Sequence, residues 1–295
     1  MNLTQINQWK YSALSQVLSA LSENIEIKNA LIFKGALILN RRLGTDRMSL
    51  DIDSNLDFDF SLQLPERGDQ KNFLEKHIPI AINNYFEKQT PVRFEFERMK
   101  VDLRPRDEHP KGWNAFLVKI SLIDHHLSGI RGLPALSIDI AAPESLTENS
   151  VDELTWDGSA TIRAYTLERI AGEKCRAFLS TLPSYRAKVK KPGDAIRVKD
   201  LYDISRILQY RPISDETFWT LAGEEFRVAC ESRYIDCQGI SSFKECWDST
   251  KKSFENESII PSGIDFKTVE VSLELILSFW GEINITPFKF PLPAE

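Results

Sequence analysis

Two aspartates, Asp51 and Asp53, have the type and spacing in this sequence best suited to metal chemistry. They lie in residues 50–60, where apolar and acidic residues alternate with the period of a β-strand. Alternate side chains of a strand share one face, so the two Cα atoms would lie about 6.5–7 Å apart. Carboxylates that close repel one another unless a cation lies between them, and Mg²⁺ prefers carboxylates together with substrate phosphates. The pair therefore predicts a site for Mg²⁺ or Mn²⁺.

A glycine turn precedes this pair. Residues 30–33 predict a short buried strand that ends at Lys34-Gly35, and residues 36–43 predict a short helix. Glycine lets a phosphate approach the backbone, and the free N–H groups of a helix N-terminus bind anions. An Asp-x-Asp pair alone is common on solvated strand faces, but this turn beside it would bring a triphosphate to the metal. The predicted triphosphate pocket has these residues: Lys34, Gly35, Ala36 and Ser49.

Asp139 is the best candidate for a third carboxylate. It lies among apolar β-formers in the predicted strand 135–141, where a charge is costly without a partner. A third acid would complete a two-metal site, in which the ions lie about 3.5–4 Å apart. The alternative is that Asp139 faces solvent on an edge strand.

Three charged residues in the second half could also take part. Lys174 falls on the apolar stripe of a predicted helix at 166–181, where it could contact a triphosphate, orient an acid or extend to the surface. Asp200 and Asp203 share a face of a predicted helix at 197–210. Either one could pair with Lys174 or accept a proton from an incoming hydroxyl as a general base. Charges beside an apolar stripe are also usual in amphipathic helices.

The elements around these residues predict an α+β fold. No regular βαβ series of a Rossmann fold is visible, and about four or five strands would form one small mixed sheet. The other elements predicted before Pro143 are helices at 6–22 and 71–87 and strands at 92–103, 114–123 and 135–141. After Pro143 we predict helices only, at 166–181, 197–210, 214–233 and 267–282. The predicted domains are an α/β domain at 1–150 and a helical domain at 151–295.

The composition is that of a globular protein. Hydrophobic residues make up 42% of the 295 residues, but no apolar run reaches the roughly 20 residues of a membrane-spanning helix. The N-terminus has no signal-peptide pattern, so we expect a cytoplasmic protein with no membrane partner. The net charge of −6 is unusual for nonspecific nucleic-acid binding, so any such contact must use a local patch. The basic segment 186–199 is either that patch or a solvated loop.

Together these segments resemble the AbiEii/AbiGii nucleotidyltransferase toxins of abortive-infection toxin–antitoxin systems, within the DNA polymerase β superfamily. Members carry F-K-G-G-T-x-L, then R-x-S-x-D-x-D, a strand acid, E-K-x-x-A and R-x-K-D-x-x-D. The matching residues are Phe33, Lys34, Gly35, Leu39, Arg47, Ser49, Asp51, Asp53, Asp139, Glu173, Lys174, Ala177, Arg197, Lys199, Asp200 and Asp203. The sequence departs from the family at Ala36 and Leu37, where members have a second glycine and a hydroxyl residue.

The resemblance implies a polymerase β-like nucleotidyltransferase domain and transfer of a nucleoside monophosphate from a nucleoside triphosphate to an acceptor, with release of pyrophosphate. It also implies that Lys174 and one of Asp200 or Asp203 are catalytic, together with the metal ligands Asp51 and Asp53. In related toxins the acceptor is the 3′ end of tRNA, whose modification blocks translation. A cognate antitoxin would restrain this activity, and antiviral defence would be its context.

Three hypotheses follow for the function. The first is a toxin-type transferase that acts on RNA, with the segment 186–199 on the RNA backbone. The second keeps the chemistry but places the nucleotide on a protein hydroxyl, which the acidic net charge favours. The third is a non-catalytic interaction module, which the departure at Ala36-Leu37 favours.

Overall fold

The computed structural model describes residues 1–44, 48–109, 113–130, 132–158, 160–190, 195–261 and 263–293. They form two compact units that alternate along the chain. Unit 1 comprises Met1–Arg41, Met48–Glu144 and Asp152–Ala164. Unit 2 comprises Arg42–Arg47, Ser145–Val151 and Tyr165–Glu295.

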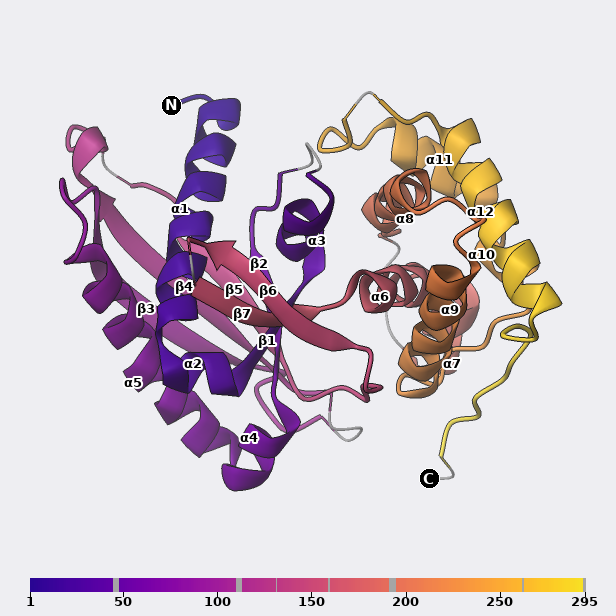
Figure 1. Ribbon diagram of the computed structural model, residues 1–295, viewed down its shortest axis with the longest axis horizontal. Coiled ribbons are helices and arrows are strands. Elements are labelled where there is room, and N and C mark those ends of the chain that lie inside the picture. The colour runs from indigo at the N-terminus through magenta and orange to yellow at the C-terminus, as the bar shows by residue number, and fades with distance from the viewer. Residues whose placement is uncertain are drawn as a thin grey trace. The chain divides into compact units, whose positions relative to one another are not determined.

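Unit 1 is built on a seven-stranded mixed sheet with the order β3-β4-β5-β2-β1-β7-β6 (Figure 1). The strands are β1 (Leu31–Lys34), β2 (Ile52–Leu56), β3 (Phe94–Arg104), β4 (Ala115–Asp124), β5 (Leu136–Ala141), β6 (Val151–Asp157) and β7 (Ala160–Tyr165). The central strand β2 runs antiparallel to β1 and parallel to β5, and β1 runs parallel to β7. On the other side β3, β4 and β5 are joined by antiparallel pairs.

Helices cover one face of this sheet. The helices of unit 1 are α1 (Leu3–Glu23), α2 (Ile25–Ala30), α3 (Gly35–Leu43), α4 (Phe58–Gln63) and α5 (Arg67–Phe86), with a 3₁₀ turn at His125–Leu127. The first helix begins at a capping box between Asn2 and Gln5. The indole Nε1 of Trp9 in α1 donates to the buried carboxylate of Asp124 at 3.0 Å. Because the rings of Phe86 and Phe94 lie 5.6 Å apart, α5 packs on the same face as α1.

The alternation of β5 separates this core face from a polar face. Leu136, Ile138 and Ile140 are fully buried, whereas Asp139 between them is only half-buried. Side chains of a strand alternate between faces, so Asp139 points away from the apolar core that the isoleucines join. The polar face of the sheet is therefore where the central strands present ionisable side chains.

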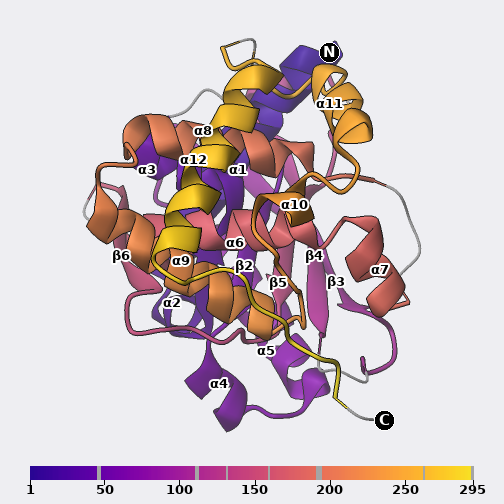
Figure 2. The same cartoon turned by 90° about the vertical axis from the view of Figure 1, so that its right-hand side faces the viewer.

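Unit 2 is a helical bundle around aromatic side chains. Its helices are α6 (Leu167–Leu179), α7 (Pro183–Lys188), α8 (Val198–Tyr210), α9 (Glu216–Glu231), α10 (Ile240–Phe243), α11 (Trp247–Glu255) and α12 (Phe266–Glu282). The last helix packs across α8 and α9 (Figure 2). Phe226 stacks on Trp280 with ring centroids 4.9 Å apart. In the same core the fully buried Arg169 pairs with Glu225 at 2.9 Å, a contact that compensates both charges.

The predicted α+β class is confirmed, but two strands were missed. We expected only helices after Pro143, whereas β6 and β7 form one end of the sheet. Because exposed acids interrupt the apolar pattern of β6, its strand period is hard to see. The predicted strand at 50–60 was too long, since β2 ends at Leu56 and Asp57 caps α4 through the N–H of Phe60 at 3.1 Å.

A division into independently folding domains at residue 150 stays a prediction. The compact units do show that residues 152–164 group with the N-terminal strands. None of the helices in the described parts of the chain combines the length and apolar character that crossing a bilayer requires.

We predict that Gly172→Ala destabilises the protein although alanine favours helices. A Cβ at Gly172 in α6 would lie 2.5 Å from the backbone nitrogen of Phe226 in α9, so the two helices would have to separate. We expect a loss of about 2 kcal/mol in urea unfolding, since the overpacking cost exceeds a propensity gain of about 1 kcal/mol. Gly281→Ala in α12, with no atom near its Cβ, is the control and should be neutral or stabilising. Equal effects of the two substitutions would contradict this packing.

Candidate metal and nucleotide site

A turn at Gly35 joins β1 to α3 and lies against Asp53, one of the predicted acids. Gly35 has φ +78°, which side chains rarely adopt. A Cβ there would lie 2.1 Å from Oδ2 of Asp53, so the aspartate occupies the space that any other residue would need. The expectation that this glycine admits a phosphate stays a prediction, and the structure shows that its missing side chain gives room to the carboxylate of Asp53.

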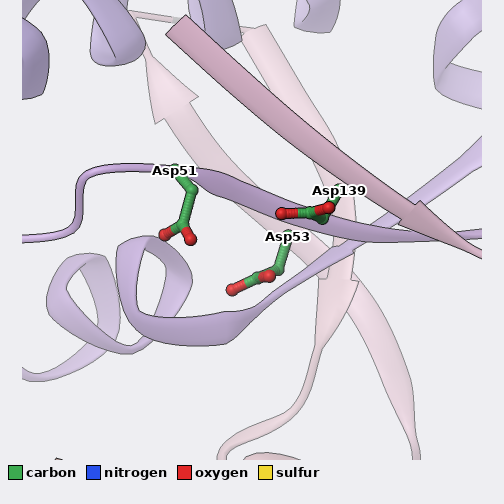
Figure 3. Close-up of side chains that lie close together, drawn as sticks. All are labelled: Asp51, Asp53 and Asp139. Atoms are coloured by element: carbon green, nitrogen blue, oxygen red, sulfur yellow. The ribbon is translucent and has the colours of Figure 1, made fainter. Parts of the chain in front are cut away.

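Three carboxylates converge on the polar face of the sheet (Figure 3). Asp51 directly precedes β2, Asp53 lies within it, and Asp139 is the in-register neighbour of Asp53 on the parallel strand β5. One oxygen of each carboxylate lies within 4.8 Å of the other two. We call these three residues the acid triad. Asp139 is not on an edge strand, because β5 lies between β4 and β2.

The acid triad concentrates negative charge. Burial raises the pKa of the Asp139 carboxyl, and the charge of Asp51 raises it further, although Arg104 acts in the opposite direction. Keeping all three carboxylates ionised therefore costs free energy unless a cation binds between them. Oxygens bound to one Mg²⁺ lie up to about 4.2 Å apart, so separations within 4.8 Å need only small side-chain movements to hold one ion. The donor set and its geometry fit a divalent cation.

Neighbouring residues fix the position of the triad. The hydroxyl of Ser49, which is 2% exposed, lies 3.0 Å from the backbone oxygen of Asp51 and 3.3 Å from its Oδ1. Ser49, predicted to shape the triphosphate pocket, is therefore placed where it orients Asp51. Lys34 faces Asp53 in the antiparallel register, so both side chains are on the polar face. Its ammonium group pairs with the buried carboxylate of Glu144 at 3.4 Å.

The departure from the family at Ala36 and Leu37 falls on the first turn of α3. Both side chains are buried, with Leu37 at 2% exposure. The position that carries a hydroxyl in the family thus contributes to the apolar core here. The backbone N–H groups of this turn are unaffected by the exchange, and Ala36 provides one of them.

Lys174, Asp200 and Asp203 form a buried cluster in unit 2. The Nζ of Lys174 lies 2.8 Å from Oδ1 of Asp200 and 2.8 Å from Oδ2 of Asp203. All three side chains are at most 9% exposed, so Lys174 does not extend to the surface. Burial would raise the pKa of Asp200, but the charges of Lys174 and Arg197 outweigh it and lower that pKa well below its usual range. A carboxylate held ionised in this way is a poor proton acceptor, which favours a positioning role for Asp200.

Several cations of the segment 186–199 bind groups of unit 2. Arg186 donates to the carbonyl of Ala195 at 2.6 Å, and Lys188 pairs with Asp236 at 2.9 Å. Lys199 lies 3.5 Å from a carboxylate oxygen of Glu257. These partners reduce the charge that the segment could offer to RNA. Other residues singled out from the sequence lie outside the described residues: Arg47, Lys191 and Asp194.

Two residues near the triad were not identified from the sequence. Glu144 directly follows Pro143 at the end of β5, and Arg104 ends β3. Only the strand register brings Arg104 near Asp139, so no local pattern could have shown it.

The chain is similar to known proteins in two comparisons. A family described as "Nucleotidyl transferase AbiEii toxin, Type IV TA system" matches residues 16–268. Among solved structures, the "Crystal structure of JHP933 from Helicobacter pylori" is similar, with a TM-score of 0.51 and 14% identity. The alignment covers 91% of this chain and 90% of that chain, and at this identity it shows a shared fold. No curated protein sequence matches the chain.

We predict that Asp139→Asn stabilises the metal-free protein at pH 7. The substitution removes one of three like charges, so the melting temperature in EDTA should rise by about 2–4 °C. The raised pKa means that the wild-type carboxyl takes up a proton as the pH falls through its titration range, so the difference should vanish in acid. Added Mg²⁺ should stabilise the wild type more than this variant. Asp59→Asn, at an exposed position in α4, is the control, and identical Mg²⁺ responses of wild type and Asp139→Asn would refute the metal site.

We predict that Gly35→Ala weakens divalent-metal binding at least tenfold, because its methyl group displaces Asp53. Calorimetric titration with Mn²⁺ measures this affinity. The control is Gly44→Ala, because Gly44 also has a positive φ, +64°, but no atom within 4 Å of its Cβ. The control carries a similar backbone strain, so a similar loss of affinity in both variants would show that strain, and not displacement of Asp53, is responsible.

Proposed function

Because the chain belongs to the AbiEii nucleotidyl transferase toxin family, we propose that it transfers a nucleoside monophosphate from a nucleoside triphosphate to RNA. The acceptor we favour is the 3′ end of tRNA in the cytoplasm, where the added nucleotide would block aminoacylation and so translation. A cognate antitoxin would restrain the enzyme, and its biological context would be abortive infection against phage. The observation that carries the proposal is the convergence of Asp51, Asp53 and Asp139 within 4.8 Å.

The reaction forms one bond to phosphorus and breaks another. The acceptor hydroxyl oxygen attacks the α-phosphorus, the bond from the α-phosphorus to the bridging oxygen breaks, and pyrophosphate leaves. The hydroxyl proton passes to a carboxylate of the triad or to water. Mg²⁺ or Mn²⁺, held by Asp51, Asp53 and Asp139, would supply stabilisation of the charge on the phosphates.

The chain's own residues would hold and orient the reactants. Ser49 would keep Asp51 directed at the cation, and Gly35 would leave room for Asp53. Backbone N–H groups at the start of α3, including that of Ala36, would donate hydrogen bonds to a phosphate oxygen at the positive end of the helix. Lys34, on the same face, would counter phosphate charge.

The buried cluster of unit 2 has a separate proposed role. Lys174 would contact phosphate, and Asp200 and Asp203 would hold its ammonium group and support the acceptor. Lys174 forms an ion pair at 2.8 Å with each aspartate, and these contacts support the proposal that both aspartates hold its ammonium group.

We predict that the protein labels RNA when it is incubated with radiolabelled nucleoside triphosphates, Mg²⁺ and total RNA. Asp53→Asn should reduce labelling on the order of a thousandfold, because a ligand of the cation is lost. Asp59→Asn, an exposed acid of α4, should label as the wild type does.

Two results would contradict the proposal. Label found on protein and never on RNA would select a protein hydroxyl as the acceptor. A failure of Mg²⁺-dependent nucleotide binding in calorimetry, together with no labelling of any kind, would identify a non-catalytic interaction module. The RNA that carries label is identified by mass analysis of its 3′ end.

A further inference from the structure

The strand register extends the polar face of unit 1 well beyond the acid triad. One row of paired residues crosses five strands in the order Lys34, Asp53, Asp139, Leu117 and Asp102. Paired residues of neighbouring strands point to the same side of a sheet. Asp102 on β3 is therefore on the same face as the triad, three strand spacings or about 14 Å from Asp53.

Basic residues surround this end of the row. Lys100 and Arg104 alternate with Asp102 on β3, and Lys119 alternates with Leu117 on β4, so all three are on the polar face. Arg98 joins them, because it pairs in register with Ser121 and its Nε donates to that hydroxyl at 3.4 Å. We call Arg98, Lys100, Arg104 and Lys119 the basic face. All four residues are exposed, with the side chain of Lys100 at 72%.

The basic face carries a net positive charge. Asp102 lies among its cations and pairs with Lys100 at 2.6 Å, and Glu95, in register with Ile123, is a further acid on the same side of the sheet. A hydrogen bond from Lys100 lowers the pKa of the Asp102 carboxyl, and the charges of Lys100, Lys119 and Arg104 lower it further. These three cations thus lie near one carboxylate, and at least two positive charges remain uncompensated by it. The excess is notable in a chain with net charge −6.

Arg104 connects the basic face to the acid triad. Arg104 pairs in register with Ala115, which pairs with Ala141, two residues beyond Asp139. The charge of Arg104 acts on both Asp102 and Asp139, so this residue lies near both groups. A polyanion bound along β3 and β4 would therefore end near the triad. This arrangement also solves an electrostatic problem, because three carboxylates repel an incoming phosphodiester unless cations lie on its path.

We propose that the basic face binds the sugar–phosphate backbone of a single-stranded RNA end and leads its terminal hydroxyl to the acid triad. The inference rests on the proposed function, and it names a route for the acceptor that the segment 186–199 was expected to provide. A face of spaced cations suits backbone contacts, which position RNA without reading its sequence.

The test is direct RNA binding by the full chain in EDTA and without nucleotide, so that no transfer is needed. The probe is a fluorescein-labelled RNA stem-loop with a single-stranded 3′ end, titrated at several salt concentrations. Lys100→Gln combined with Lys119→Gln should weaken binding on the order of tenfold and reduce the salt slope by about 1.4, from about 0.7 for each phosphate contact. Asp102→Asn should have the opposite effect and tighten RNA binding, because it removes a negative charge from the basic face.

The matched control combines Lys76→Gln with Lys88→Gln. Both lysines are exposed, one on α5 and one directly after it, away from the polar face. This double variant has the same change in net charge and should bind the RNA as the wild type does. Equal weakening by the two double variants would overturn the proposal, since only the total charge would then matter. Polyglutamate that binds the wild type in place of the RNA would overturn it as well.

The proposal that the basic face binds RNA and the proposed transfer reaction can be refuted independently of each other. If the wild type labels RNA but the Lys100/Lys119 variant keeps wild-type RNA affinity and salt slope, the basic face is not the RNA site. If the wild type labels nothing while that variant alone loses RNA affinity, the RNA-binding face stands and the transfer chemistry does not.

Discussion

The repulsion among three carboxylates is the main constraint on the structure of unit 1, because its sheet has to hold these like charges together. Asp51, Asp53 and Asp139 converge within 4.8 Å, and burial makes the charge of Asp139 more costly. The parallel pairing of β2 and β5 keeps two of them side by side, so the backbone itself holds the like charges together. Glycine at position 35 then gives Asp53 its space, and Ser49 anchors Asp51. The hydrogen bonds of the central strands thus maintain a charge arrangement that favours a bound cation over an empty site.

The sequence predicted the members of the triad better than the means by which they meet. Asp51 and Asp53 follow from strand period alone, and Asp139 from an acid among apolar residues. The adjacency of Asp53 and Asp139 depends on a parallel register between strands far apart in the chain, which no local pattern encodes. The same limit explains why Arg104 was missed. At Asp57 the error was of another kind, because an aspartate that continued the alternation instead capped a helix.

Charge is distributed unevenly over the protein, and this distribution determines which of its surfaces would attract a polyanion although the chain as a whole is acidic. In unit 2 the cations of greatest interest are paired internally, as in the contacts of Lys174 with Asp200 and Asp203. Such buried pairs add little long-range attraction for a polyanion because their charges already compensate one another, and a phosphate at Lys174 would compete with the two aspartates. The exposed cations of β3 and β4 differ in this respect, since one carboxylate is shared among several of them. Local geometry, and not net charge, therefore decides which surface of such a chain would attract a polyanion.

The order of the strands has a consequence for how the protein folds while it is synthesised on the ribosome. Strand β1, which leads into the glycine turn, pairs on one side with β2 and on the other with β7, where Phe33 meets Ala164. Residues 160–165 are synthesised long after β1, so a nascent chain that stops before them leaves β1 as a bare edge. The sheet that carries the acid triad is therefore completed only late in translation. The edge of β1 next to the glycine turn therefore stays open to other strands until residues 160–165 have been made.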